Sequence, residues 1–224
     1  MMTARVESRE VVIPAGEAAL PGTLSLPGSM RGVVLFAHGS GSSRYSPRNR
    51  FVAGALTDAG FATLLFDLLI ESEAEDRRNV FDIELLASRL LAAIRWTRRN
   101  PATCAAPLGI FGASTGAAAA LVAAARDYGV RAVVSRGGRP DLAGGWLVRV
   151  DSPTLLIVGG RDEEVLRLNR QAMAKLECET RLSIVPGATH LFEEPGALEE
   201  AAAMARDWFL AHLRQEATDA AHSI

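Results

Sequence analysis

Gly112-Ala113-Ser114-Thr115-Gly116 is the most informative stretch of this chain. It follows the apolar run Leu108-Gly109-Ile110-Phe111 and precedes an alanine-rich segment that continues to about Tyr128. This order predicts a strand, a sharp turn and a helix, with the oxygen of Ser114 exposed above a sheet. The N-terminus of the helix adds positive potential where negative charge would form on a substrate oxygen. Ser114 is therefore a candidate nucleophile, and the alternative is that it only caps the helix.

Apolar strands alternate with helical patterns along the rest of the chain. We expect buried strands at residues 33–37, 62–66, 108–111, 130–135, 154–158 and 181–185. We expect further helices at residues 47–59, 82–99, 165–176 and 195–213. Residues 11–13 and 23–26 flank turn residues and predict an antiparallel pair at the start of the chain. Repeated β-α-β units predict an α/β fold, with a mostly parallel central sheet and helices on both faces.

Length and composition indicate one globular domain. The chain has 224 residues, and we expect the domain to span residues 1–214, with a polar tail at 215–224. Its 24 basic and 26 acidic residues give a net charge of −2, which offers no basic field to attract nucleic acid. Two cysteines, Cys104 and Cys178, cannot form a disulfide scaffold and suit a reducing compartment. Neither a secretory signal nor an apolar run of about 18 residues is visible, so we expect a cytoplasmic protein without a membrane partner.

His190 is the candidate general base, because a serine hydroxyl needs a base to remove its proton. It follows the last expected strand, and ligands of parallel sheets bind at the carboxyl ends of strands. His212 and His222 lie in the last helix and the tail, away from this edge. The alternative for His190 is a solvated loop histidine.

Asp162 is the candidate acid that orients the imidazole. It follows the strand at 154–158 and lies between Ser114 and His190 in the chain, and the order serine, acid, histidine suits such a site. Two alternatives stay open: Asp162 caps the next helix, or Asp141, after the preceding strand, supplies the acid.

The donors for a developing oxyanion are expected from two segments. One is the backbone N–H of Thr115, directly after the nucleophile. The other is the N–H of Ser40 in His38-Gly39-Ser40-Gly41, followed by that of Gly41, because glycines let the backbone approach a ligand closely. His38 itself is interpreted as a structural residue that bonds neighbouring backbone.

Three further residues are candidates for contact with substrate: Gly41 and Arg44, on the loop after the strand at 33–37, and Arg136, at a strand end. Arg136 and the nearby Arg139 could bind an anionic group. The alternative, which we favour, is a local ion pair with Asp141, Glu71 or Glu73. The charged run at 71–78 is interpreted as a solvated loop. Only residues 136–153 separate two strands at the place where a lid is often inserted, which is too short for a helical lid.

These motifs resemble the α/β-hydrolases and, more narrowly, the dienelactone-hydrolase-like branch of small bacterial hydrolases. The resemblance covers nearly the whole chain. The resemblance rests on six segments, which are residues 38–41, 112–116, 135–142, 160–162, 187–190 and 190–196. It implies an α/β-hydrolase fold without a cap domain and a triad of Ser114, Asp162 and His190. Dienelactone hydrolases proper use a cysteine nucleophile where this chain has Ser114, so the resemblance implies a serine esterase mechanism.

We therefore expect a serine hydrolase that cleaves small carboxylic esters through an acyl-serine intermediate. A lactone, thioester or amide hydrolase with the same triad, and a non-catalytic ligand-binding protein, are the alternatives. No metal or cofactor is expected, because metal-ligating residues do not cluster and the glycine-rich segments lack a P-loop lysine. Some proteins that the chain resembles are fused to a phosphoribosyltransferase domain, which suggests such a partner. A homodimer is a further expectation that one sequence does not test.

Overall fold

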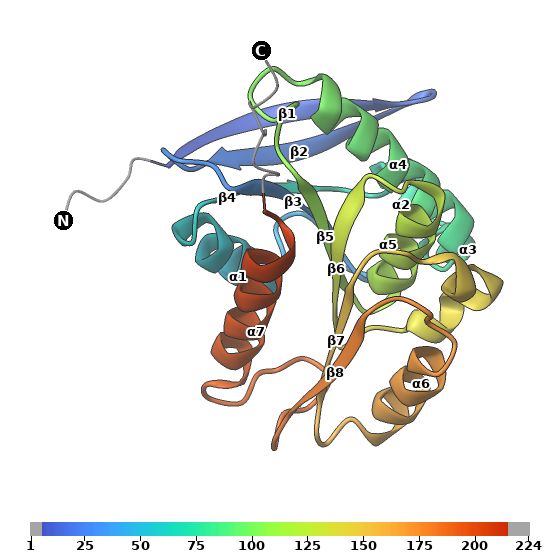
Figure 1. The fold of residues 1–224 in the computed structure, drawn as a ribbon. Helices are drawn as coiled ribbons and strands as arrows, with labels where there is room; N and C mark the ends of the chain where they lie inside the picture. The colour runs from blue at the N-terminus through green and yellow to red at the C-terminus, as the bar shows by residue number, and fades with distance from the viewer. Residues whose placement is uncertain (1–5, 215–224) are drawn as a thin grey trace, which may run out of the picture.

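The computed structural model describes residues 6–214 and contains one eight-stranded sheet (Figure 1). The strands lie in the order β1-β2-β4-β3-β5-β6-β7-β8. Their bounds are β1 (Glu7–Ala15), β2 (Ala18–Leu26), β3 (Gly32–Ala37), β4 (Phe61–Phe66), β5 (Leu108–Ala113), β6 (Val130–Arg136), β7 (Thr154–Gly159) and β8 (Thr180–Val185). β1 and β2 pair antiparallel, as do β2 and β4, and the remaining pairs are parallel. The predicted α/β architecture is confirmed, and the expected tail at 215–224 lies outside the described residues.

Helices cover both faces of the sheet (Figure 1). α1 (Pro47–Asp58) and α7 (Ala197–His212) lie on one face, and α4 (Ile83–Arg99), α5 (Thr115–Arg126) and α6 (Glu163–Met173) lie on the other. Within residues 6–214 no helix is long and apolar enough to cross a membrane.

The core consists of two apolar layers separated by the sheet. Every residue of β3, β4, β5 and β7 is buried, because helices cover both faces of these strands. Phe36, Phe61, Phe111 and Phe209 fill the layer under α1 and α7. The layer under α4 and α5 includes the alanines of α5, which are small enough to let this helix lie close to the sheet. The central strands thus form a rigid base for the loops at their carboxyl ends.

Two segments differ from the sequence-based expectation. The charged run at 71–78 is not a loop throughout, since it contributes to the short helices α2 (Glu71–Ala74) and α3 (Arg77–Val80). Glu73 forms an ion pair with Arg89 of α4, so a contact distant in sequence holds α2 in place. The segment after β6 forms the 3-10 helical segment η1 (Pro140–Arg149), kinked at Gly144, and no lid is inserted there. The absence of a cap domain in the described chain agrees with the prediction.

Candidate active site

Ser114 lies on the sharp turn between β5 and α5. Its backbone has φ 51° and ψ −124°, a conformation that side-chain-bearing residues rarely adopt. The flanking glycines permit this turn: a Cβ on Gly112 would lie 2.5 Å from Cα of Ala117, and one on Gly116 would lie 2.2 Å from the carbonyl oxygen of Ala37. The hydroxyl of Ser114 makes no capping hydrogen bond to α5, so the interpretation of Ser114 as a helix cap does not hold.

His190 and Asp162 form a hydrogen-bonded pair. Nδ1 of His190 lies 2.6 Å from Oδ2 of Asp162, and the two side chains are 40% and 15% exposed. Asp162 precedes α6 but makes no side-chain cap, so its carboxylate is engaged with the imidazole and not with the helix. Because Nδ1 donates to this carboxylate, Nε2 is left as the ring atom able to take up a proton.

Ser114 and His190 line one cavity of about 230 Å³. Its wall also includes residues of the loop after β3, the first turn of α1 and the end of β6. The structure therefore brings the three candidate triad residues, which lie far apart in the chain, to the carboxyl edge of the sheet. Within residues 6–214 no three histidine, cysteine or carboxylate side chains gather as a metal site would require.

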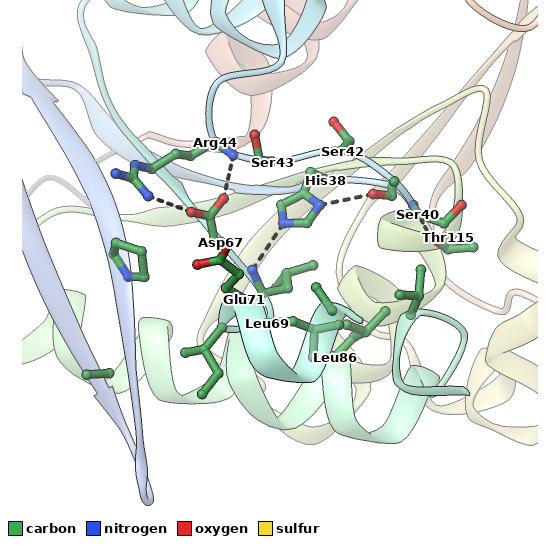
Figure 2. A pocket seen from close by; sticks show the side chains of 18 residues that line it. His38, Ser40, Ser42, Ser43, Arg44, Asp67, Leu69, Glu71, Leu86 and Thr115 are labelled. Atoms are coloured by element: carbon green, nitrogen blue, oxygen red, sulfur yellow. Dashed lines mark hydrogen bonds and ion pairs between the residues drawn. The ribbon is translucent and has the colours of Figure 1, made fainter. Parts of the chain in front are cut away.

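The loop at residues 38–41, hereafter called the oxyanion loop after its expected role, packs directly on Ser114. A Cβ on Gly39 would lie 2.8 Å from Cβ of Ser114. His38 fixes the loop: its Nδ1 lies 3.0 Å from the carbonyl oxygen of Gly39, and its Nε2 accepts the N–H of Leu68 at 3.1 Å (Figure 2). Burial lowers the pKa of His38, which suits a neutral imidazole that bonds to backbone on both sides.

The two predicted oxyanion donors lie side by side, but one of them has an internal partner. The N–H of Ser40 donates to Oγ1 of Thr115 at 2.9 Å (Figure 2). The side chain of Thr115 thus stands between the oxyanion loop and α5, a role that the sequence did not indicate.

A larger cavity of about 520 Å³ also borders the oxyanion loop (Figure 2). Ser40, Gly41 and Thr115 border it, whereas Ser114 and His190 do not. Much of its wall is apolar and comes from the segment after β4, from α3 and from α4, with Leu68, Leu69, Ile70, Val80 and Leu86. Sequence reasoning did not predict this cavity, although the apolar residues at 68–70, directly after a strand, were a signal for it.

Arg44, predicted to contact substrate, is placed between that cavity and the β1–β2 pair. Its Nη1 lies 2.5 Å from Oδ2 of Asp67, and its backbone N–H donates to Oδ1 of the same residue at 2.7 Å. Its guanidinium also lies 4.3 Å from the ring centroid of Tyr45. This arginine is therefore engaged within the protein and braces the loop after β3.

The expected ion pairs of Arg136 and Arg139 have different outcomes. Arg139 forms a two-point ion pair with Asp141, with both distances 2.8 Å, which confirms that prediction and engages the alternative acid. For Arg136 the prediction is wrong, since none of the described carboxylates pairs with its guanidinium. Arg139 pairs with Asp141 because the two residues lie two positions apart in the chain. Glu73, another expected partner, pairs with Arg89 instead.

The family model described as the dienelactone hydrolase family matches residues 20–215. The chain belongs to the dienelactone hydrolase family. A solved dienelactone hydrolase from Anabaena variabilis is 54% identical, with a TM-score of 0.91 over 93% of this chain and 99% of that one. Membership in this family, with its α/β-hydrolase fold, supports a hydrolase.

A putative phosphoribosyl transferase of Mycobacterium tuberculosis is 60% identical over 209 residues, which are 93% of this chain and 47% of that protein. The chain thus spans about half the length of this relative. The esterase Est1E from Butyrivibrio proteoclasticus has a TM-score of 0.77 at 14% identity, over 90% of this chain and 98% of that one. At that identity the likeness concerns the fold alone.

Proposed function

We propose that this chain is a serine hydrolase that cleaves small carboxylic esters through an acyl-serine intermediate. Ser114 is the nucleophile, His190 is the general base and acid, and Asp162 orients His190 and stabilises its charged form. The observation that carries the proposal is the 2.6 Å contact between His190 and Asp162 beside a serine held at positive φ.

The proposed reaction has two stages. Oγ of Ser114 attacks the ester carbonyl carbon while Nε2 of His190 takes the hydroxyl proton. The tetrahedral intermediate collapses, the proton passes from His190 to the departing alcohol, and the acyl group remains on Ser114. Water then attacks the acyl carbon with His190 again as base, which releases the acid and restores the serine.

The negative oxygen of the intermediate needs donors that are already in place. The N–H of Thr115 lies at the N-terminus of α5, so the helix dipole assists it. The second donor comes from the contact between Ser40 and Thr115, as either the N–H of Ser40 or the hydroxyl of Thr115.

A lactone is the second candidate substrate, because the family is described by a lactone hydrolase activity. A lactone is a cyclic ester, so the same attack applies, and the acid and alcohol stay joined after the ring opens. Thioesters and amides would use the same groups with a different leaving atom.

The test is hydrolysis of p-nitrophenyl acetate and butyrate by the wild type, Ser114→Ala and Ser88→Ala. Ser88 is an exposed serine of α4, so it controls for serine replacement as such. We expect Ser114→Ala to lose about 10⁶-fold in kcat, as loss of a triad nucleophile does elsewhere, and Ser88→Ala to match the wild type. Equal activity of Ser114→Ala and the wild type would refute the proposal.

A further inference from the structure

A buried arginine that pairs with none of the described carboxylates lies beside the candidate nucleophile. Arg136, at the end of β6, is 7% exposed. Within residues 6–214 its Nε and Nη1 have no hydrogen-bond acceptor, and Nη2 makes a long 3.3 Å bond to Oδ1 of Asn49. Buried charged side chains are normally paired, because loss of hydration is otherwise uncompensated. An unpaired guanidinium at this depth therefore indicates a site for an external anion.

The sheet register places Arg136 next to the reaction centre. Arg136 pairs with Ala113 across β5 and β6, one residue before Ser114. Its guanidinium lies 5.7 Å from the ring centroid of Phe192, a contact that supplies no hydrogen-bond acceptor to its N–H groups. Arg136 also lines the 230 Å³ cavity together with Ser114 and His190. An anion bound to Arg136 would therefore share a cavity with the reacting ester.

A second cation and a helix N-terminus face the same cavity. Arg48, in the first turn of α1, has a buried Nε that finds no acceptor in the described part of the chain, and its Nη1 reaches Oε1 of Glu193 at 3.3 Å. The Glu193 side chain is 65% exposed, so water screens this pair. Ser46 caps α1 by accepting the N–H of Asn49 at 3.4 Å, which leaves its own hydroxyl proton free to donate. Burial, and then repulsion from Arg48, lower the pKa of Arg136 to about 10, so it remains charged at neutral pH.

We propose that Ser46, Arg48, Asn49 and Arg136 form an anion subsite for the phosphate group of a phosphorylated carboxylic ester. Two guanidinium groups and a helix N-terminus face this cavity, and of the carboxylates described around it Glu193 is screened by water and Asp162 is bonded to His190. A phosphate dianion can accept from both guanidinium groups and from the helix N-terminus at once. The donors lie on two elements, β6 and the start of α1. They therefore approach a bound group from different directions, which suits a tetrahedral phosphate. A phosphate monoester offers three acceptor oxygens in different directions, whereas a carboxylate offers two in one plane. The subsite rests on the proposed function for the ester that reacts, but phosphate binding itself does not require turnover.

The direct test is calorimetric binding of inorganic phosphate at low salt and about pH 8, where phosphate is a dianion. We expect saturable binding to the wild type and at least about tenfold weaker binding to Arg136→Met, since a charge-assisted hydrogen bond has about that effect. Arg139→Met is the matched control, because Arg139 follows the same strand but is paired with Asp141. It should bind phosphate as the wild type does. Absence of binding to the wild type, or equal binding by Arg136→Met, would overturn the proposal.

Succinate, titrated under the same conditions, distinguishes phosphate from carboxylate. Weaker binding of succinate than of phosphate supports the assignment. Binding of succinate as tight as that of phosphate would contradict it, because the subsite would then have no preference for a tetrahedral dianion.

Thermal unfolding shows whether the variant is folded and gives a second readout. Without ligand, Arg136→Met should melt at a higher temperature than the wild type, because an uncompensated buried charge is gone. Phosphate should raise the melting temperature of the wild type but not that of Arg136→Met. If Arg136→Met does not fold, Arg48→Met provides the same binding comparison from the more exposed side of the cavity, and unchanged phosphate affinity there would count against the subsite.

Failure of this proposal can be told apart from failure of the esterase proposal. Ser114→Ala should bind phosphate as the wild type does, although it cannot turn over an ester. Phosphate binding that depends on Arg136, in a protein that hydrolyses no ester, would reject the esterase and retain the subsite. Ester hydrolysis that depends on Ser114, without phosphate binding, would reject the subsite and retain the esterase.

Discussion

The backbone N–H of Ser40 donates a hydrogen bond to Oγ1 of Thr115 across 2.9 Å (Figure 2). This contact joins the two segments from which an oxyanion hole would be built. Since Oγ1 accepts from Ser40, the hydroxyl proton of Thr115 remains available to a further acceptor. We propose that the residue after the candidate nucleophile contributes its hydroxyl as well as its N–H to the oxyanion hole.

Replacement of Thr115 separates these roles. Thr115→Val keeps the shape but removes the hydroxyl, and we expect kcat for p-nitrophenyl acetate to fall about 10²-fold, as for loss of one oxyanion donor. Thr115→Ser restores the hydroxyl and should stay close to the wild type. Wild-type kcat in Thr115→Val would mean that the N–H of Ser40, once released, serves the oxyanion directly.

Asp162 should act on the rate through the tautomer of His190. Asp162→Asn removes the negative acceptor of the Nδ1 proton, so kcat should fall about 10⁴-fold with little change in the free energy of unfolding. Asp141→Asn is the comparison, since Asp141 is engaged with Arg139. Steady-state kinetics of the two variants test this assignment, and a larger loss in Asp141→Asn would transfer the acid's role to Asp141.

The turn around Ser114 should tolerate no side chain at Gly116. A Cβ there would lie 2.2 Å from the carbonyl oxygen of Ala37, so Gly116→Ala should lower the free energy of unfolding by about 3 kcal/mol. Gly54, in α1, has no atom within 4 Å of the position that a Cβ would take, and Gly54→Ala should add about 0.5–1 kcal/mol. Urea unfolding measures both. Equal stability of the two variants would show that the turn is not as tightly packed as described.

His38 should make the oxyanion loop sensitive to acid. Burial lowers its pKa, so the folded protein takes up this proton at a lower pH than the unfolded chain. Stability should therefore fall as pH decreases below about 6.5, the ordinary histidine value. The proton would be added at Nε2, which accepts the N–H of Leu68. Between about pH 7.5 and pH 5, the free energy of unfolding should fall more for the wild type than for His38→Gln. Equal falls would show that His38 is not the group responsible for the pH dependence.

The sheet was predictable because its strands are short apolar runs bounded by glycine and charged residues. Val33 to Ala37 is an example, since burial on both faces leaves no polar position in the strand. The helices α2 and α3 were not predictable, because residues 71–80 are rich in charge and a distant contact between Glu73 and Arg89 holds α2 in place. In this segment tertiary contacts, and not the local sequence pattern, determine the secondary structure.

The candidate site likewise has a part that was predictable from the sequence and a part that was not. Ser114, Asp162 and His190 each follow a strand, so the topology of a parallel sheet brings them to one edge. The state of Arg136 does not follow from such a rule. Nearby acidic residues favoured an ion pair, yet Asp141 pairs with Arg139, and Arg136 points instead toward Asn49 of α1. Which of several nearby carboxylates an arginine pairs with depends on three-dimensional packing, and the pattern of one sequence does not encode that choice.

The most direct test of the central claim, that Ser114 is an activated nucleophile, is covalent labelling with a fluorophosphonate followed by peptide mass spectrometry. Phosphonylation needs a serine whose proton is removed by a base. We predict one adduct, on the peptide that contains Ser114, absent from Ser114→Ala and much slower to form in His190→Ala. An adduct on another residue, or equal labelling of Ser114→Ala, would contradict the account.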